Sequence, residues 1–316
     1  MPAKRAYGMD QEFYPWSPIV TRPILRWPDN ARVALAVIVN LEHWDWDTPA
    51  GTPVAVSPLG GPEGMWTGNQ PQFPDIGGYG NHEYGNRVGI FRILAVLDKY
   101  GITPTLALDK AVADHYPTLV KEGQKRGAEF IAHGLSRRRI IHVGMSEDEE
   151  RQYIRASIEA VERATGKRPL GWSGPDFQET ANTPNLLAAE GIRYLCDWGN
   201  DEQPTPMRVK SGRMVVVPYE LGVNDIRVFI RENHTPEQYY RMVCDHFDTL
   251  YKDSESGGRV LCLPLHPFVI GLPFRIKYLD KALDYMCSHE GVWRTTGWEI
   301  AEWYYKHYYK DPGKFE

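Results

Sequence analysis

The stretch ARVALAVIVNLEHWDWD, residues 31–47, decides the fold. Residues 32–41 are almost continuously apolar and rich in Val, which is typical of a parallel strand that is covered on both faces. Ionisable side chains follow directly, beginning with Glu42 and His43. The sequence therefore predicts a buried strand whose carboxyl end carries chemically active groups.

Strand and helix patterns alternate through the rest of the chain. Strand patterns cover residues 103–108, 129–132, 170–173, 192–198, 214–220 and 260–265, and helical patterns cover 84–100, 111–126, 146–165, a short segment from Pro184, 236–251, 273–288 and 298–309. Successive strand–helix–strand units form right-handed crossovers between parallel strands. We therefore predict an α/β fold, a distorted (β/α) barrel of mainly parallel strands. Residues 31–316 are expected to form this single domain, preceded by an N-terminal arm of residues 1–30.

One long segment interrupts the alternation. Residues 47–80 are rich in Gly and Pro and have few periodic apolar positions. A loop of this length inside a compact domain is usually functional or disordered. We expect it to border the active site.

Composition and charge exclude several classes of function. The net charge is -5, and acidic and basic residues are interspersed, so there is no basic stripe for a nucleic acid and no polybasic membrane patch. No apolar run approaches the roughly 20 residues that span a bilayer, and the first residues lack the apolar segment of a secretory signal. We expect a cytoplasmic protein that acts on a small molecule.

The four cysteines carry no functional argument. They show no CxxC spacing and lie within apolar patterns, so we expect buried free thiols at Cys196, Cys244, Cys262 and Cys287.

Ionisable side chains stand at or just beyond the carboxyl ends of several predicted strands. They are Glu42, His43, His133, Asp176, Asp197 and His266. In a barrel of parallel strands these ends lie on one rim, where active sites form. A single histidine there is more often a hydrogen-bonded core group, but three on separate strand ends favour an active site.

Other candidates are more ambiguous. Trp44, Trp172 and Trp198 stand near strand ends and would suit binding of a flat or sugar ring, with core packing as the alternative. Histidines on predicted helices are interpreted as structural: His115, His246, His289 and His307. His82 and His142 lie in predicted loops, and their roles stay open.

The ordered motifs resemble the polysaccharide deacetylase superfamily. The motifs are Glu42-His43, AHGLS at 132–136, GWSGP at 171–175 and LPLHP at 263–267, and the resemblance spans roughly residues 31–304. It implies a distorted (β/α) barrel that hydrolyses N-acetyl or other amide bonds.

The second motif departs from the metal-dependent members of that family, in which it holds two metal-binding histidines four residues apart. Here those places are His133 and Arg137. A guanidinium has no lone pair for a metal, so Arg137 disfavours a three-ligand zinc centre. A metal, if bound, would use His43 and His133, with Glu42 or Asp45 completing the ligands.

With this departure, the sequence resembles the cofactor-independent allantoinase-like branch of the family. The same resemblance is seen in three further stretches: WPDNARVALAVIVNLE at 27–42, VNDIR at 223–227 and residues 265–293. The resemblance implies hydrolysis of an amide or cyclic amide without a cofactor, with a divalent metal such as zinc as the alternative. It also implies a homo-oligomer, in which the N-terminal arm would pack against a partner or wrap its own barrel.

A reaction hypothesis follows. Glu42 or His133 activates water, Arg137 and backbone N–H groups stabilise the oxyanion, and His266 protonates the departing nitrogen. Substrate would be bound by His43, Trp44, Trp172, Asp176, Asp197 and Trp198, with Asp197 also orienting a histidine. The alternatives are a metal-dependent N-deacetylase of an acetylated amino sugar and a non-catalytic binding protein on a degenerate barrel.

Overall fold

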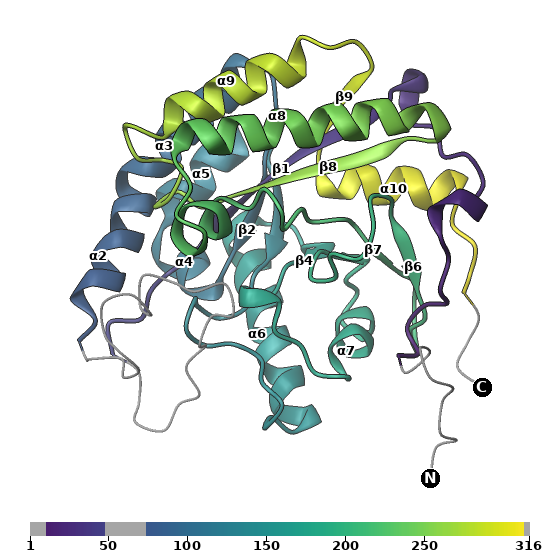
Figure 1. Ribbon diagram of the computed structural model, residues 1–316. Coiled ribbons are helices and arrows are strands. Elements are labelled where there is room, and N and C mark those ends of the chain that lie inside the picture. Colours follow the sequence, from purple (N-terminus) through teal and green to yellow (C-terminus); the bar gives the residue numbers. More distant parts are fainter. Residues whose placement is uncertain (1–10, 48–73, 313–316) are drawn as a thin grey trace.

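A computed structural model describes residues 11–47 and 74–312. Its centre is a curled, mostly parallel sheet with helices packed around it (Figure 1). The strands are β1 (Val33–Leu41), β2 (Thr105–Leu108), β3 (Glu129–Ala132), β4 (Gly171–Trp172), β5 (Tyr194–Leu195), β6 (Thr205–Met207), β7 (Met214–Val216), β8 (Arg259–Leu265) and β9 (Val292–Thr295). Their order is β6-β7-β5-β4-β3-β2-β1-β8, with β9 paired to β1, and only the β6–β7 pair is antiparallel.

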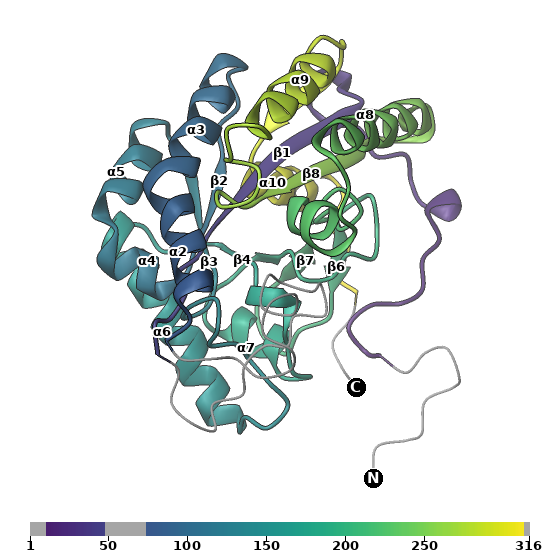
Figure 2. The ribbon, with the colours of Figure 1, turned by 60° about the vertical axis from the view of Figure 1, so that its left-hand side comes forward.

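The α-helices are α2 (Ile76–Tyr84), α3 (Ile90–Lys99), α4 (Lys110–His115), α5 (Pro117–Lys125), α6 (Glu147–Thr165), α7 (Thr183–Ala189), α8 (Pro236–Asp253), α9 (Ile276–Cys287) and α10 (Gly297–His307). Figure 2 shows α2, α3 and α5 along one side of the sheet and α8 beside α9 along another. Two π-helical segments, η3 (Gly85–Gly89) and η5 (Arg227–Arg231), lie among them. None of the helices in the described part of the chain is long and apolar enough to cross a membrane.

Strand β1 is the centre of the core, and all nine of its residues are buried. Side chains alternate across a strand, so Leu35 and its odd-numbered neighbours pack under the outer helices. Ala36 and its even-numbered neighbours pack with Ile300 of α10. The run is nearly continuously apolar because both faces of β1 are buried, as the sequence predicted.

The sheet curls until its two ends approach each other. The backbone N–H of Glu220 donates to the carbonyl of Cys262 in β8 (3.2 Å), and the N–H of Val260 donates to Glu202 before β6 (2.9 Å). These bonds join the last strand of the series to the region of β6 and β7. The predicted distorted (β/α) barrel is confirmed.

Several boundaries differ from the sequence-based prediction. Residues 76–80, expected in the long loop, form the first turns of α2, capped by Asp75 although three glycines suggested a loop. The helix expected over 111–126 divides at Tyr116, because Pro117 cannot continue a preceding helix. Strands β6 and β9 were not predicted, since each has only three or four residues. The remainder of the expected loop, 48–73, lies outside the described residues.

The described part of the N-terminal arm packs against its own barrel. Arg22 forms a two-point ion pair with Asp201, at 2.8 and 2.5 Å, and the Trp27 indole donates to the carbonyl of Arg259 (2.9 Å). All four cysteines are free thiols, as expected, although Cys287 is only partly buried.

Candidate active site

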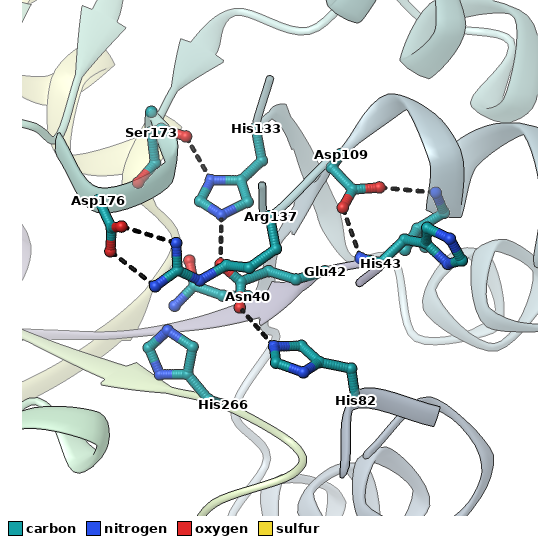
Figure 3. A network of polar contacts seen from close by, with 12 residues as sticks. Asn40, Glu42, His43, His82, Asp109, His133, Arg137, Ser173, Asp176 and His266 are labelled. Atoms are coloured by element: carbon teal, nitrogen blue, oxygen red, sulfur yellow. Dashed lines mark hydrogen bonds and ion pairs between the residues drawn. The ribbon is translucent and has the colours of Figure 1, made fainter. Parts of the chain in front are cut away.

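Polar side chains from separate strand ends converge on one pocket (Figure 3). Its empty volume is about 300 Å³, and its lining consists of Asn40, Glu42, His133, Arg137, Ser173, Gly174, Asp176, Phe177, Tyr219, Asn224, Ile226 and His266. Because β1, β3 and β8 run parallel, Glu42, His133 and His266 emerge at the same edge of the sheet. The structure thus brings together the four residues expected to be catalytic, and Asp176 with them.

Glu42 is the centre of the cluster. Its Oε1 lies 3.2 Å from His133 Nε2 and 3.4 Å from Arg137 Nε, and the side chain is buried. Burial alone would raise the pKa of the Glu42 carboxyl. The Arg137 charge and the hydrogen bond with His133 outweigh burial, so the pKa lies well below its usual range. Glu42 is therefore an anion at any working pH.

Arg137 is held by two carboxylates. Its terminal nitrogens donate to both oxygens of Asp176, at 2.7 and 2.8 Å, in a buried two-point pair. Asp176 lies in a strained turn, because it and Phe177 have φ values of 54° and 56°. Asp176 therefore lines the pocket as the partner of Arg137.

His133 and His266 are each fixed through Nδ1. The His133 Nδ1–H donates to the carbonyl of Ser173. His266 Nδ1 lies 2.6 Å from Oδ1 of the buried Asp225, whose Oδ2 accepts the backbone N–H of His266 (2.8 Å). In His266 this leaves Nε2 as the nitrogen available for chemistry, whereas Nε2 of His133 lies 3.2 Å from Glu42 Oε1.

Asp197 differs from the expectation that it orients a histidine. Its Oδ1 accepts the backbone N–H of Gly174 (2.7 Å), and burial raises its pKa strongly, helped by the nearby Glu179 carboxyl. Trp198 donates to that same Glu179 (2.9 Å) and does not line the pocket. These residues support the turn that carries Asp176.

The other expected substrate contacts face away from the pocket. His43 follows Glu42, so its side chain lies on the opposite side of the extended backbone, where its Nδ1 is 3.1 Å from the Tyr116 hydroxyl. Burial lowers the pKa of His43. Trp44 stacks on His82 with 4.7 Å between ring centroids, and Trp172 is a fully buried core residue.

Two functional candidates, Asn40 and Asp225, were not predicted from the sequence, and the role of a third, His82, was left open. Asn40 precedes Glu42 by two positions and shares its face of β1, so a polar residue inside an apolar strand was the available signal. Its Nδ2 donates to the Tyr219 hydroxyl (2.9 Å). Asp225 had no signal beyond its place in VNDIR, and His82 seemed to lie in a loop.

The described residues do not suit a conventional catalytic zinc site. Among residues 11–47 and 74–312, no three His, Cys, Asp or Glu side chains are placed to hold a metal ion. His43 and His133, the two nominated ligands, have different partners, and the Arg137 cation lies against Glu42. A metal would have to share its carboxylate ligand with a guanidinium.

Comparisons with known proteins agree with this fold. The polysaccharide deacetylase family model matches residues 82–195. A peptidoglycan deacetylase of Helicobacter pylori (strain ATCC 700392 / 26695) is 24% identical over 268 residues, covering 72% of this chain and 90% of its own. A crystal structure of a probable polysaccharide deacetylase from Pseudomonas aeruginosa PAO1 is 27% identical with a TM-score of 0.79, covering 92% and 96%. The structure of PuuE allantoinase is 29% identical with the same TM-score and the same coverage.

The curled parallel sheet and the polar pocket at its carboxyl edge define a hydrolase built on a distorted (β/α) barrel. The chain is similar to the polysaccharide deacetylase superfamily over residues 82–195 and in its fold, and it acts as a hydrolase of carbon–nitrogen bonds other than peptide bonds.

Proposed function

We propose that this chain hydrolyses a small cyclic amide of the hydantoin type without a metal, as an allantoinase-like enzyme. The observation that carries the proposal is the place of Arg137, 3.4 Å from Glu42 and paired at two points with Asp176. A permanent cation in this position takes the place that a metal ion would have beside the carboxylate.

The pocket contains the three kinds of group that amide hydrolysis needs. Glu42, with His133 beside it, is placed to hold and orient the attacking water, and the guanidinium of Arg137 lies between the carboxylates of Glu42 and Asp176. This guanidinium, with backbone N–H groups, would stabilise the oxyanion by its positive charge. His266, oriented by Asp225, would protonate the departing nitrogen, which is a poor leaving group without a proton.

The size and polarity of the pocket support a small substrate with N–H groups. The cavity between the lining side chains is small, which favours a small substrate over a polymer chain. Oδ1 of Asn40 is buried and has no hydrogen-bond partner among the described residues, while its Nδ2 is committed to Tyr219. A ring N–H would satisfy this acceptor.

The similarity to PuuE allantoinase over nearly the whole chain supports a cyclic amide as the substrate. The similarity to a peptidoglycan deacetylase makes the N-acetyl bond of an amino sugar the alternative bond to test. Purified protein would be treated exhaustively with a chelator and assayed against hydantoins, linear amides and N-acetylated amino sugars. We expect ring opening of a hydantoin and no release of acetate. Acetate release that depends on added zinc would contradict the proposal.

A further inference from the structure

The ring of His82 faces Glu42 from the side opposite His133 (Figure 3). It belongs to α2 and is buried, with a relative exposure of 4%. Trp44 and Phe268 lie against its two faces, with ring centroids at 4.7 and 4.0 Å. The two aromatic rings therefore fix the plane of the imidazole.

The hydrogen bond of His82 defines its tautomer. Nδ1 lies 2.9 Å from the carbonyl oxygen of Gly78, and a carbonyl can only accept, so Nδ1 carries the hydrogen. Burial lowers the pKa of His82 to about 4, although the Glu42 charge opposes this. At neutral pH the ring is uncharged, and Nε2 presents a lone pair.

Two acceptors then face each other. Nε2 of His82 lies 3.8 Å from Oε2 of Glu42, and within the described part of the chain neither atom has a hydrogen-bond partner. Burying two such acceptors is costly unless a donor satisfies both. A water oxygen about 2.8 Å from each atom spans this separation and offers one hydrogen to each.

The helical segment that carries His82 also fixes the rest of the site. Asn86, four residues later in the π-helical segment η3, donates to the backbone carbonyl of Glu42 (2.8 Å). Gly89 lies so close to the loop after His266 that a Cβ there would be 2.1 Å from the Pro267 oxygen. One segment thus holds Glu42 by its backbone, faces its carboxylate and abuts the His266 loop.

We propose that His82 Nε2 and Glu42 Oε2 together bind the water that attacks the substrate, and that His82 accepts its proton. This inference rests on the proposed hydrolysis and names its base. The water oxygen bonds to the substrate carbonyl carbon while one O–H bond breaks and that proton passes to Nε2. The carbon–nitrogen bond then breaks as His266 protonates the nitrogen, and the proton on His82 returns to His266 through solvent.

Two features of the surroundings stabilise the protonated ring against the burial that lowers the pKa of His82. Once protonated, His82 forms an ion pair with Glu42, whose pKa is held too low for it to take the proton itself. The faces of Trp44 and Phe268 also stabilise a cation between them. His133 has no comparable freedom, because its Nε2 already lies 3.2 Å from Glu42.

The test compares two phenylalanine substitutions. His82→Phe fills the aromatic slot but removes the acceptor, so we expect kcat to fall by about 100-fold or more with little change in KM. His289→Phe is the matched control, because His289 also bonds the carbonyl four residues back (2.9 Å) and packs among aromatic rings, away from the pocket. His82→Gln accepts a hydrogen bond but no proton, and should be as slow as His82→Phe. A kcat for His82→Phe within about threefold of the parent would overturn the proposal.

Two measurements on the unaltered protein need no substrate. Nitrogen-15 NMR should show His82 neutral at about pH 7 with its proton on Nδ1, and a high-resolution crystal structure should show a water bonded to Nε2 and to Glu42. An imidazolium at neutral pH, a direct His82–Glu42 bond or a metal ion at this place would each refute the inference. If the chain hydrolyses no hydantoin yet these two results hold, the water site stands and only the substrate assignment fails.

Discussion

Glu42 and His43 are neighbours in the sequence, yet they belong to different regions of the molecule. Glu42 faces the pocket, where it contacts His133 and Arg137. His43 faces a cluster outside it, where Tyr116 bonds both His43 and Glu83. Both regions hold titratable groups from strand ends and helices. Of the two, the pocket alone brings together a buried carboxylate, a fixed cation and histidines from separate elements, so convergence rather than residue type identifies the site.

The largest effect is expected from Glu42→Gln, which keeps the shape of the side chain but removes its charge. The anion is the common partner of Arg137 and two histidines, so kcat should fall by about 1,000-fold or more. Steady-state kinetics on the best hydantoin would measure it. A variant that keeps a tenth of the parent kcat would remove Glu42 from the centre of the account.

Asp225→Asn should have the next largest effect. Asn can donate to His266 Nδ1 and thereby favour the wrong tautomer, so we expect kcat to drop by about 100-fold. The loss should appear in kcat more than in KM. An unchanged kcat would mean that His266 is not the proton donor.

Arg137→Lys keeps the positive charge and loses the two-point geometry with Asp176. We expect a fall in kcat/KM of about tenfold to 100-fold, because an ammonium cannot bind both carboxylate oxygens in the same plane. The matched control is Arg139→Lys, at an exposed residue beside Asp45, and its kcat/KM should be close to that of the parent. Equal losses in both variants would remove the special role of the Arg137–Asp176 pair.

Glu179→Gln tests the support behind the pocket through stability. Burial raises the pKa of Glu179 from 4.5 to about 7, so the folded protein holds a proton that the unfolded chain releases. Stability therefore declines as pH rises from 4.5 to 7 and is constant above that. Gln at this position has no carboxyl group to ionise in a buried place. The free energy of unfolding of the variant should therefore exceed that of the parent by on the order of 1 kcal/mol at about pH 8, and by less at about pH 5. Urea denaturation at both pH values would measure this, and an equal change at both would contradict the buried proton.

His43→Phe should have the smallest effect on catalysis. Its side chain lies outside the pocket, so we expect kcat and KM within about twofold of the parent. A loss comparable with that of Glu42→Gln would erase the contrast between the two neighbours.

The sequence predicted much of the fold because β1 and the longer helices have strong patterns. Strand β1 is a nearly unbroken apolar run, and Ser146 with Glu149 forms the capping box that starts α6. Short strands such as β6 and β9 carry too few residues for a pattern. The curl of the sheet depends on contacts between Glu220 and Cys262 that no local pattern records.

The site was predictable where a polar group directly ends a long strand. Glu42, His133 and His266 satisfy this condition, and all three line the pocket. His43 follows the same strand as Glu42 and Trp172 ends β4, but both point elsewhere, because orientation at a strand end is set by alternation and packing. His82 and Asp225 come from segments whose structure was not predicted, so their approach to Glu42 and His266 appears only in three dimensions.

We propose that the Glu42 pocket hydrolyses its substrate with Arg137 in place of a metal ion. The most direct measurement is the rate of hydantoin ring opening by protein whose metal content has been determined after exhaustive chelation. We expect full activity with far less than one metal ion per chain, and no gain in activity when zinc is added. Loss of activity on chelation, restored in proportion to bound zinc, would contradict it.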